Sequence, residues 1–386
     1  MNNILLIGNG FDLAHGLLTS YNQFLEVMKN WNDIYREFTW RYYGTTFFNK
    51  YMCNASEMNE NNIKELNEIM SNNSWVKYFK QCEAEIDGWI DFEKEILPVI
   101  KLFETIFSID NYNITGSSTY GQVNIEKKYF NSNQIRIINM WDKYLSSSSD
   151  IVSIKESYRS YNYGILKKKI SKLLSDEFNE FIRSFEIYLL EFVHKTENIQ
   201  LLKQIKDINA DYVISFNYTH TEELYGIAKE NVHHIHGMIR EDVNTGINNM
   251  VLGLNEQENQ NMDFIYFVKY FQRIQKASGV KYKEFVNKAH YDSLGQRIEE
   301  DYTLHIYGHS LDETDEDILK YVIGDKDENG KLDLKPKKVI IYYYDSFDYE
   351  QKVINLIKLY GRAIVEEYME NGLFEFIPTT QEIHSP

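Results

Sequence analysis

Four short stretches of this sequence carry glycine or a chemically active side chain where a β-strand is expected to end. In the first, ILLIGNGFDLAHG (4–16), an apolar run stops at Gly8-Asn9-Gly10. Backbone amides of such a turn, leading into a helix, can bind the phosphates of a ligand. A tight turn in which Asp12 caps the helix explains the same pattern. The candidate ligand-binding residues of this stretch are Gly8, Asn9, Gly10, Asp12 and His15.

The second stretch, SFNYTHTEELYG (215–226), ends an expected strand at Asn217. The Asn217 side chain offers both a hydrogen-bond donor and an acceptor at the strand end, which makes it a candidate catalytic residue. The alternative is a role as helix cap. Thr219 or Thr221 suits that role better, because a cap directly precedes its helix. Thr219 is also a candidate ligand-binding residue.

The third stretch, HHIHG (233–237), would place His234 and His236 on one face of a strand. Two histidines without a clear carboxylate partner are a weak indication of a metal site, and no metal is expected. His236, next to a glycine at the strand end, is instead a candidate general base. A structural histidine with satisfied hydrogen bonds is the alternative.

The fourth stretch, IYGHSLDETDED (306–317), ends a strand at Gly308. Gly308, His309 and Ser310 then offer amide, imidazole and hydroxyl groups to an anionic ligand. The acidic residues that follow suit the N-terminus of a helix. Because no second glycine completes a G-x-S-x-G nucleophile elbow, a serine hydrolase is disfavoured.

A helix is expected over MDFIYFVKYFQRIQKA (262–277). Its apolar residues step by three and four and should face the core; they are Phe264, Phe267, Phe271 and Ile274. Lys269, Arg273 and Lys276 form a basic group on another side. A solvated face is one interpretation of this group. In the other, Lys269 or Arg273 reaches the ligand's phosphates, and Arg273 is the residue we expect to bind them.

The elements that would position these residues follow from hydrophobic patterning. Short apolar, β-branched runs are typical of buried parallel strands; they cover 4–8, 211–217, 232–237, 250–254, 303–310 and 338–344. Helical spacing dominates between the first two runs, for example at 75–103, with Pro98 as a kink or break, and at 166–192. The segments 111–124 and 146–150 are expected to be loops. The pattern predicts an open, mostly parallel, Rossmann-like α/β sheet with a large helical insertion after the first strand. Residues 1–30 and 205–386 would form the sheet domain, and 31–204 the insertion.

Composition narrows the range of partners. The chain has 386 residues and a formal net charge of −17, so its surface should repel nucleic acid and anionic membranes. A small nucleotide held by backbone amides remains compatible with this charge. The two cysteines are too few for a disulfide framework or a four-cysteine zinc site. The first apolar run is too short for a signal sequence or a membrane span, so a cytoplasmic location is expected. Self-association into a homo-oligomer stays open.

Several of these stretches together resemble the AbiH family of bacteriophage abortive-infection proteins. The residues that carry the resemblance are GNGFDLAHGLLTSYNQF (8–24), FNYTHTEELYG (216–226), HIHG (234–237), LGLNE (252–256) and IYGHSLDETD (306–315). That family is in turn similar to the sirtuin-like NAD-binding fold. This second resemblance implies that Gly8-Asn9-Gly10 cradles NAD, that Asn217 lies by the nicotinamide ribose and that His236 is the catalytic histidine. It also implies that Gly308-His309-Ser310 covers the phosphates.

Two departures bear on the implied activity. Thr219 stands where the sirtuin-like pattern has an acidic residue, and the cysteine zinc module of the protein-deacylating sirtuins is missing. Both disfavour protein deacylation. The resemblance implies a phage-defence effector that binds NAD and cleaves its nicotinamide–ribose bond, with a phage-derived trigger or partner. The alternative is a nucleotide-binding sensor or interaction module without turnover, acting through a partner protein.

Overall fold

The computed structural model describes residues 1–40, 58–82, 92–108, 124–158, 163–196, 199–240, 248–255, 261–291, 293–294, 296–328 and 330–379. The chain divides into two compact units. The sheet unit comprises Met1–Thr19, Thr196–Glu241 and Lys276–Pro386, and the helical unit comprises Ser20–Lys195 and Asp242–Gln275. The expected sheet domain, 1–30 and 205–386, differs from the sheet unit in three segments: 20–30 and 242–275 belong to the helical unit, and 196–204 belongs to the sheet unit.

The sheet unit is built on six parallel strands in the order β13-β12-β9-β1-β5-β6. Their bounds are β1 Asn2–Ile7, β5 Tyr212–Ser215, β6 Val232–His234, β9 Tyr302–Tyr307, β12 Lys338–Tyr343 and β13 Phe374–Pro378. The predicted α/β class with a parallel sheet is confirmed, and five of the six predicted apolar runs form strands of that sheet. All six strands end at the same edge, so their carboxyl-terminal residues gather there.

One strand prediction is wrong, and one strand was missed. The run 250–254 is not a strand of the sheet; it lies in the helical unit, where Leu254 forms a single bridge with Val268. Its apolar side chains are buried, and burial alone produces such a run. The edge strand β13 was not predicted. It carries Glu375 within and Pro378 at its end, both of which weaken a strand pattern.

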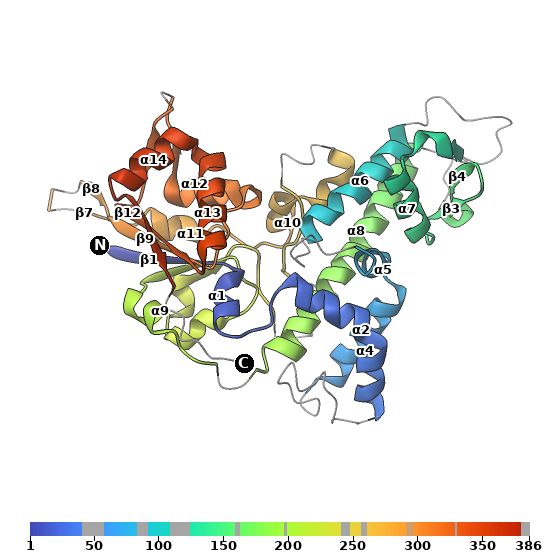
Figure 1. The fold of residues 1–386 in the computed structure, drawn as a ribbon, viewed down its shortest axis with the longest axis horizontal. Helices are drawn as coiled ribbons and strands as arrows, with labels where there is room; N and C mark the ends of the chain where they lie inside the picture. The colour runs from blue at the N-terminus through green and yellow to red at the C-terminus, as the bar shows by residue number, and fades with distance from the viewer. Residues whose placement is uncertain are drawn as a thin grey trace. The chain divides into compact units, whose positions relative to one another are not determined.

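Successive side chains of each strand point to opposite faces of the sheet, and both faces are apolar and covered by helices (Figure 1). The face that includes Ile4 and Leu6 packs against α11 (Tyr282–Val286), α12 (Glu316–Ile323), α13 (Ser346–Tyr360) and α14 (Arg362–Glu370). The face that includes Leu5 and Ile7 packs against α1 (Asn9–Ala14) and α9 (Lys203–Ile208). The central strand β1 is thus buried on both sides, which explains its unbroken apolar sequence. Smaller elements of this unit are β7 Ala289–Tyr291, β8 Arg297–Glu299, β10 Gly324–Lys326, β11 Leu332–Leu334 and the 3₁₀ turns η6 Thr221–Tyr225, η7 Lys229–Asn231 and η10 Glu313–Asp315.

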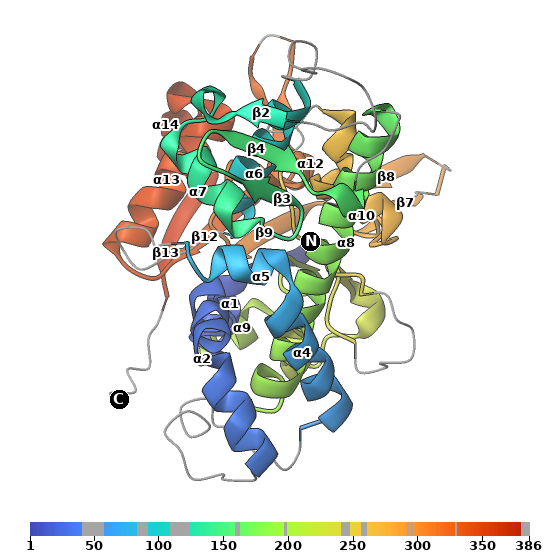
Figure 2. The same cartoon turned by 90° about the vertical axis from the view of Figure 1, so that its right-hand side faces the viewer.

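The helical unit has an aromatic core around its longest helix. Figure 2 shows α8 (Tyr163–Tyr188) running beside α4 (Glu60–Asn72) and α5 (Ser74–Phe79), and the contacts agree. The helix predicted over 166–192 is confirmed; its last residues, Leu189–Val193, form a π-helical turn. Phe181 packs its ring 4.6 Å from Phe79 and 5.3 Å from Phe92. The other elements are α2 Tyr21–Trp40, α6 Phe92–Ser108, α7 Ser132–Met140, α10 Lys269–Gln275, β2 Asn124–Glu126, β3 Leu145–Ser147, β4 Ile151–Ile154, η3 Lys127–Tyr129, η4 Glu156–Tyr158 and η9 Met262–Phe267.

Several helix and loop predictions need correction in this unit. Pro98, expected to kink or break its helix, does not break it: α6 continues through this residue. Of the expected loops, residues 146–147 belong to β3 and residue 124 begins β2, whereas 111–123 lie outside the described residues. The helix expected over 262–277 is divided at Val268 into a 3₁₀ turn and α10. No helix among the described residues is long and apolar enough to cross a membrane.

The side-chain assignments for 262–277 are also partly wrong. Phe264 and Phe267 are buried as predicted, but Ile274 is 69% exposed because the helix is interrupted before it. Lys269 was expected in a basic group, either as part of a solvated face or as a contact to the ligand's phosphates. It is instead buried, with its ammonium group 2.8 Å from a carboxylate oxygen of Glu93.

The glycines after β1 and β9 allow two turns of the backbone to touch. Gly8 donates its N–H to the Tyr307 carbonyl at 3.2 Å, and Gly10 donates to the Gly308 carbonyl at 2.8 Å. A Cβ atom on Gly10 would lie 2.7 Å from the Gly308 Cα, and one on Gly308 would overlap the Phe11 nitrogen. Gly308 also has a φ of +68°, where side chains are disfavoured. Contact between backbones, more than access for a ligand, therefore explains the missing side chains.

We predict that Gly308→Ala lowers the free energy of unfolding far more than Gly16→Ala. Both glycines have positive φ, so each substitution should cost about 1–2 kcal/mol of backbone strain. A Cβ on Gly16 meets nothing within 4 Å, whereas one on Gly308 meets the α1 backbone, which adds about 1–3 kcal/mol. Urea unfolding of both variants measures the difference. Equal losses of stability would contradict the close contact of the two turns.

Candidate functional site

The predicted site residues of the sheet unit lie at the carboxyl ends of β1, β5, β6 and β9. In an open parallel sheet this edge is where ligands bind, at the point where the strand order changes direction. Here that point lies between the neighbouring strands β1 and β9. The side chains form three groups. We call them the Asp12 cluster (Asp12, Asn217, Thr219, Thr221), the Asp315 cluster (Phe216, His236, His309, Asp315) and the His220 triad (His220, Glu222, His234).

The Asp12 cluster surrounds a buried carboxylate. Thr219 donates its hydroxyl to Asp12 Oδ2 at 2.6 Å, and Thr221 donates to the Thr219 hydroxyl at 3.2 Å. Burial raises the pKa of Asp12 to about 6, although the two threonine hydroxyls lower it. Neither Asp12 nor the threonines cap a helix: Asp12 is the fourth residue of α1, whose N-cap is Gly8. The capping interpretations of these residues are therefore wrong.

Asn217 faces this carboxylate from the end of β5. Its side chain lowers the pKa of Asp12, so the amide lies near the carboxylate. Nevertheless, Asn217 Nδ2 and Asp12 Oδ1 are both buried without a well-formed hydrogen bond to any described residue. Buried polar atoms almost always have partners. This donor and this acceptor are thus the groups that the cluster offers to a ligand.

The Asp315 cluster holds His236. The His236 Nε2 lies 3.0 Å from Asp315 Oδ1, and the His309 Nε2 lies 3.6 Å from Asp315 Oδ2. Leu311 donates its N–H to His309 Nδ1 at 2.9 Å, so the His309 proton sits on Nε2, toward Asp315. The Phe216 ring packs 4.3 Å from His309 and 5.3 Å from His236. A carboxylate that binds one nitrogen of an imidazole leaves the other, Nδ1 of His236, as the basic atom.

The sequence did not identify Asp315 as a site residue. Its acidic run was assigned to a helix N-terminus, and Asp315 does lie in η10, directly before α12. An aspartate at a helix N-terminus looks the same in the sequence whether or not it also binds a distant histidine. The contact spans 79 positions along the chain.

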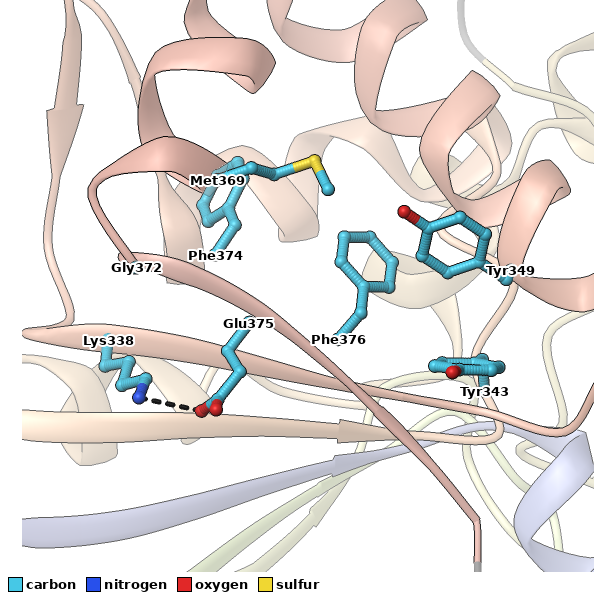
Figure 3. A pocket seen from close by; sticks show the side chains of 8 residues that line it. All are labelled: Lys338, Tyr343, Tyr349, Met369, Gly372, Phe374, Glu375 and Phe376. Atoms are coloured by element: carbon cyan, nitrogen blue, oxygen red, sulfur yellow. Dashed lines mark ion pairs between the residues drawn. The ribbon is translucent and has the colours of Figure 1, made fainter. Parts of the chain in front are cut away.

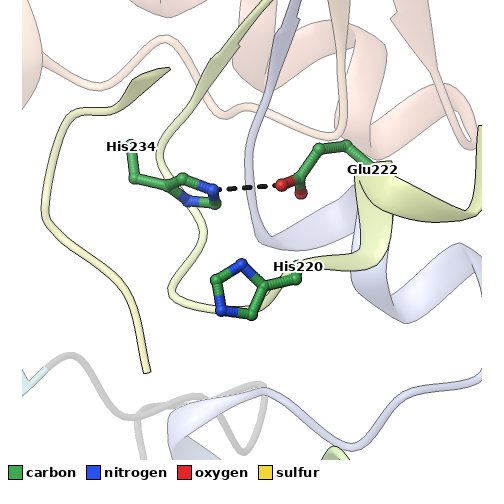
Figure 4. A group of neighbouring side chains, drawn as sticks. All are labelled: His220, Glu222 and His234. Carbon is green, nitrogen blue, oxygen red and sulfur yellow. Dashed lines mark hydrogen bonds and ion pairs between the residues drawn. The ribbon is translucent and has the colours of Figure 1, made fainter. Parts of the chain in front are cut away.

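The His220 triad was not predicted either, and it corrects the arrangement expected for HHIHG. The strand β6 ends at His234, so His236 follows in a turn and the two histidines have different partners. His234 Nε2 lies 3.0 Å from Glu222 Oε1 (Figure 4). Burial lowers the pKa of His234, but the hydrogen bond and the negative charge of Glu222 outweigh burial and raise that pKa overall. Glu222 is the carboxylate partner that the sequence pattern lacked.

The remaining predicted residues have mainly structural contacts. The N–H of Gly10 is used by Gly308, so it is not available to a phosphate. Asn9 accepts a hydrogen bond from the Thr19 hydroxyl at 2.6 Å. His15 Nδ1 lies 2.6 Å from the Phe11 carbonyl, and its Nε2 lies 2.6 Å from the Tyr225 hydroxyl. Ser310 is exposed. Arg273 belongs to α10 of the helical unit, and its role toward a ligand stays a prediction.

A pocket of about 470 Å³ lies elsewhere in the sheet unit, at the edge formed by β12 and β13 (Figure 3). Its lining includes Tyr343, Tyr349 and Phe376, and none of the predicted site residues. Lys338 and Glu375, the charged residues of this lining, form an ion pair of 2.7 Å and neutralise each other. No buried carboxylate or histidine lines this pocket, so it is a weaker candidate for chemistry than the strand ends.

The fold and these clusters define a class: α/β proteins with buried carboxylates and histidines at the carboxyl ends of a parallel sheet. Within that class, the family model described as bacteriophage abortive infection AbiH matches residues 4–332. The chain belongs to the AbiH family. No curated protein and no solved structure matches it.

The buried Asp12 carboxylate should make stability depend on pH. Its folded pKa, about 6, is above the ordinary 3.8, so its protonated form favours folding. That contribution is complete below about pH 4 and is lost as the pH rises through about 6, a change of about 3 kcal/mol. We predict that Asp12→Asn, which cannot ionise, becomes more stable relative to wild type from pH 4 to pH 7. Urea unfolding of both proteins in EDTA measures this. A constant difference across that range would contradict the raised pKa.

Proposed function

We propose that this protein is an abortive-infection effector that binds NAD and hydrolyses its nicotinamide–ribose bond. The observation that carries the proposal is the buried His236–Asp315 pair, 3.0 Å between Nε2 and Oδ1, near the carboxyl ends of the strands. A carboxylate-held imidazole is a general base suited to activating water. Membership in the AbiH family supports the role in phage defence.

The strand order gives further support. Numbered along the chain, the six strands lie in the order 3-2-1-4-5-6, which is the order of the Rossmann-type dinucleotide-binding fold. In that fold the ligand lies where the order reverses, here between β1 and β9. Asp12 and Asn217 follow β1 and β5 at this edge. The Asp12 carboxylate can accept a hydrogen bond from a ribose hydroxyl, and the Asn217 amide can donate one to it.

The proposed reaction consumes one water. The C1′–N bond between ribose and nicotinamide breaks, and its electron pair leaves with nicotinamide. A water oxygen bonds to C1′ as positive charge builds on the ribose, as in glycoside hydrolysis. His236 Nδ1 takes the water proton, and Asp315 stabilises the resulting imidazolium through Nε2. Asn217 would orient the ribose and the water. The products are ADP-ribose, nicotinamide and a proton.

One part of the sirtuin-like expectation lacks support. The Gly10 amide, expected to cradle the diphosphate, is already bonded to Gly308. The diphosphate would then depend on side chains of the sheet unit, for which the exposed Ser310 is the candidate. A protein that binds a nucleotide without turnover, and acts through a partner, is the alternative.

We predict that purified protein, supplied with NAD and a lysate of phage-infected cells, releases nicotinamide and ADP-ribose. His236→Asn and Asp315→Asn should each lower the rate by about 10²–10⁴-fold, because each removes the general base or its orientation. Asp317→Asn is the matched control: it changes an exposed carboxylate two residues further on and should leave the rate unchanged. Chromatography of the products measures the rate.

Two outcomes would count against hydrolysis. Undiminished NAD under all conditions, together with measurable nucleotide binding, would favour the sensor without turnover. Equal rates in wild type and in folded His236→Asn protein would remove the His236–Asp315 pair from the chemistry.

A further inference from the structure

We infer that His220, Glu222 and His234 form a binding site for a divalent transition-metal ion of the Zn²⁺ type. The site goes beyond the proposed hydrolysis and does not depend on it. His220 follows β5, Glu222 lies in η6 and His234 is the last residue of β6. One nitrogen from each histidine and one Glu222 oxygen lie within 4.8 Å of one another. Small side-chain rotations would bring three such atoms to the roughly 2.0–2.2 Å that Zn²⁺ ligands take.

Backbone carbonyls orient both imidazoles for this role. His234 Nδ1 lies 3.0 Å from the Asn217 carbonyl, and His220 Nε2 lies 3.1 Å from the Ile239 carbonyl. A carbonyl only accepts, so each of these nitrogens carries the ring proton. In the neutral rings the lone pairs are then on His234 Nε2 and His220 Nδ1. Figure 4 shows one ring nitrogen of His220 directed toward the His234–Glu222 pair. Metal-binding histidines commonly donate their other N–H to a carbonyl in this way.

The contact between His234 and Glu222 itself needs a cation. Nε2 of a neutral His234 and Oε1 of Glu222 are both acceptors, yet they lie 3.0 Å apart. Either a proton or a metal ion must lie between them. A proton between the two atoms would explain only the contact of Oε1. The second oxygen of the carboxylate, Glu222 Oε2, would still have no partner. That oxygen is buried and has no hydrogen bond to any described residue.

Burial and charge favour a doubly charged ion over a single proton. The Glu222 side chain is only 2% exposed, and its charge acts on a second buried carboxylate, Asp12. Two buried negative charges are costly unless they are paired or bind a metal. His220 is partly exposed, which gives an ion a path to the site from solvent.

The donor set selects the class of ion. Two imidazoles and a carboxylate suit Zn²⁺ and neighbouring transition metals, whereas Mg²⁺ and Ca²⁺ prefer oxygen ligands alone. Three protein ligands leave a fourth position for water, as in zinc sites that are not purely structural.

The test uses the full-length protein without an affinity tag, stripped of metal by chelator and dialysed. We expect wild type to bind about one Zn²⁺ per chain in a competition titration against a chromophoric chelator, with a large excess of Mg²⁺ having no effect. Glu222→Gln and His220→Ala each remove a ligand. Each should weaken binding by more than the roughly 10–100-fold that loss of an outer-shell partner costs. His290→Ala, which removes an exposed histidine outside the triad, should bind as wild type does.

A thermal melt with and without Zn²⁺ guards against variants that fail to fold. Zn²⁺ should raise the melting temperature of wild type and of His290→Ala, and leave that of His220→Ala unchanged. His220 is partly exposed, so its replacement by alanine should be tolerated. The inference is overturned if folded wild type binds no stoichiometric Zn²⁺, or if both ligand variants bind it as wild type does. No nucleotide is present in either assay, so NAD hydrolysis and metal binding can fail independently.

Discussion

The close contact of two backbone turns determines the geometry of the strand-end region. The turn after β1 and the turn after β9 meet through the Gly10 N–H and the Gly308 carbonyl, 2.8 Å apart, with no room for a Cβ on either residue. This contact joins α1, which carries Asp12, to the loop that carries His309 and leads to Asp315. Because β1 and β9 are neighbours in the sheet, the two halves of the strand order are joined at the carboxyl edge of the sheet. The glycines thus serve the shape of the site more than they serve direct phosphate binding.

Buried charge is the second organising feature. Three carboxylates, Asp12, Glu222 and Asp315, lie at the strand ends with little exposure. Each has a different environment: hydroxyl donors for Asp12, an imidazole for Glu222 and two imidazoles for Asp315. Burial of a charged group is costly unless the group is paired or hydrogen-bonded, and each of these carboxylates has such a partner. The surface pocket beside β13 has no comparable group.

The sequence predicted much of the sheet because buried parallel strands are continuously apolar, and the central β1 is the clearest example. It missed β13, an edge strand that contains Glu375 and ends at Pro378. It misassigned 250–254 as a strand of the sheet, because an apolar run indicates that a segment is buried but not which element it packs against. In the candidate site, residue types at strand ends selected Asp12, Asn217, Thr219, His236 and His309 as candidates, but not the carboxylate partners of the histidines. Asp315 and Glu222 meet their histidines across 79 and 12 positions, and no local pattern encodes such pairing.

The central claim is that the carboxyl ends of β1, β5, β6 and β9 form a nucleotide-binding site. Hydrogen–deuterium exchange of the full-length protein, with and without saturating ADP-ribose, tests this most directly. The account predicts slower amide exchange in 8–15, 215–222, 232–239 and 308–315, with exchange in 338–343 and 374–378 unchanged. Slowing confined to the β12–β13 edge, or no slowing at the strand ends when ADP-ribose is bound, would contradict it.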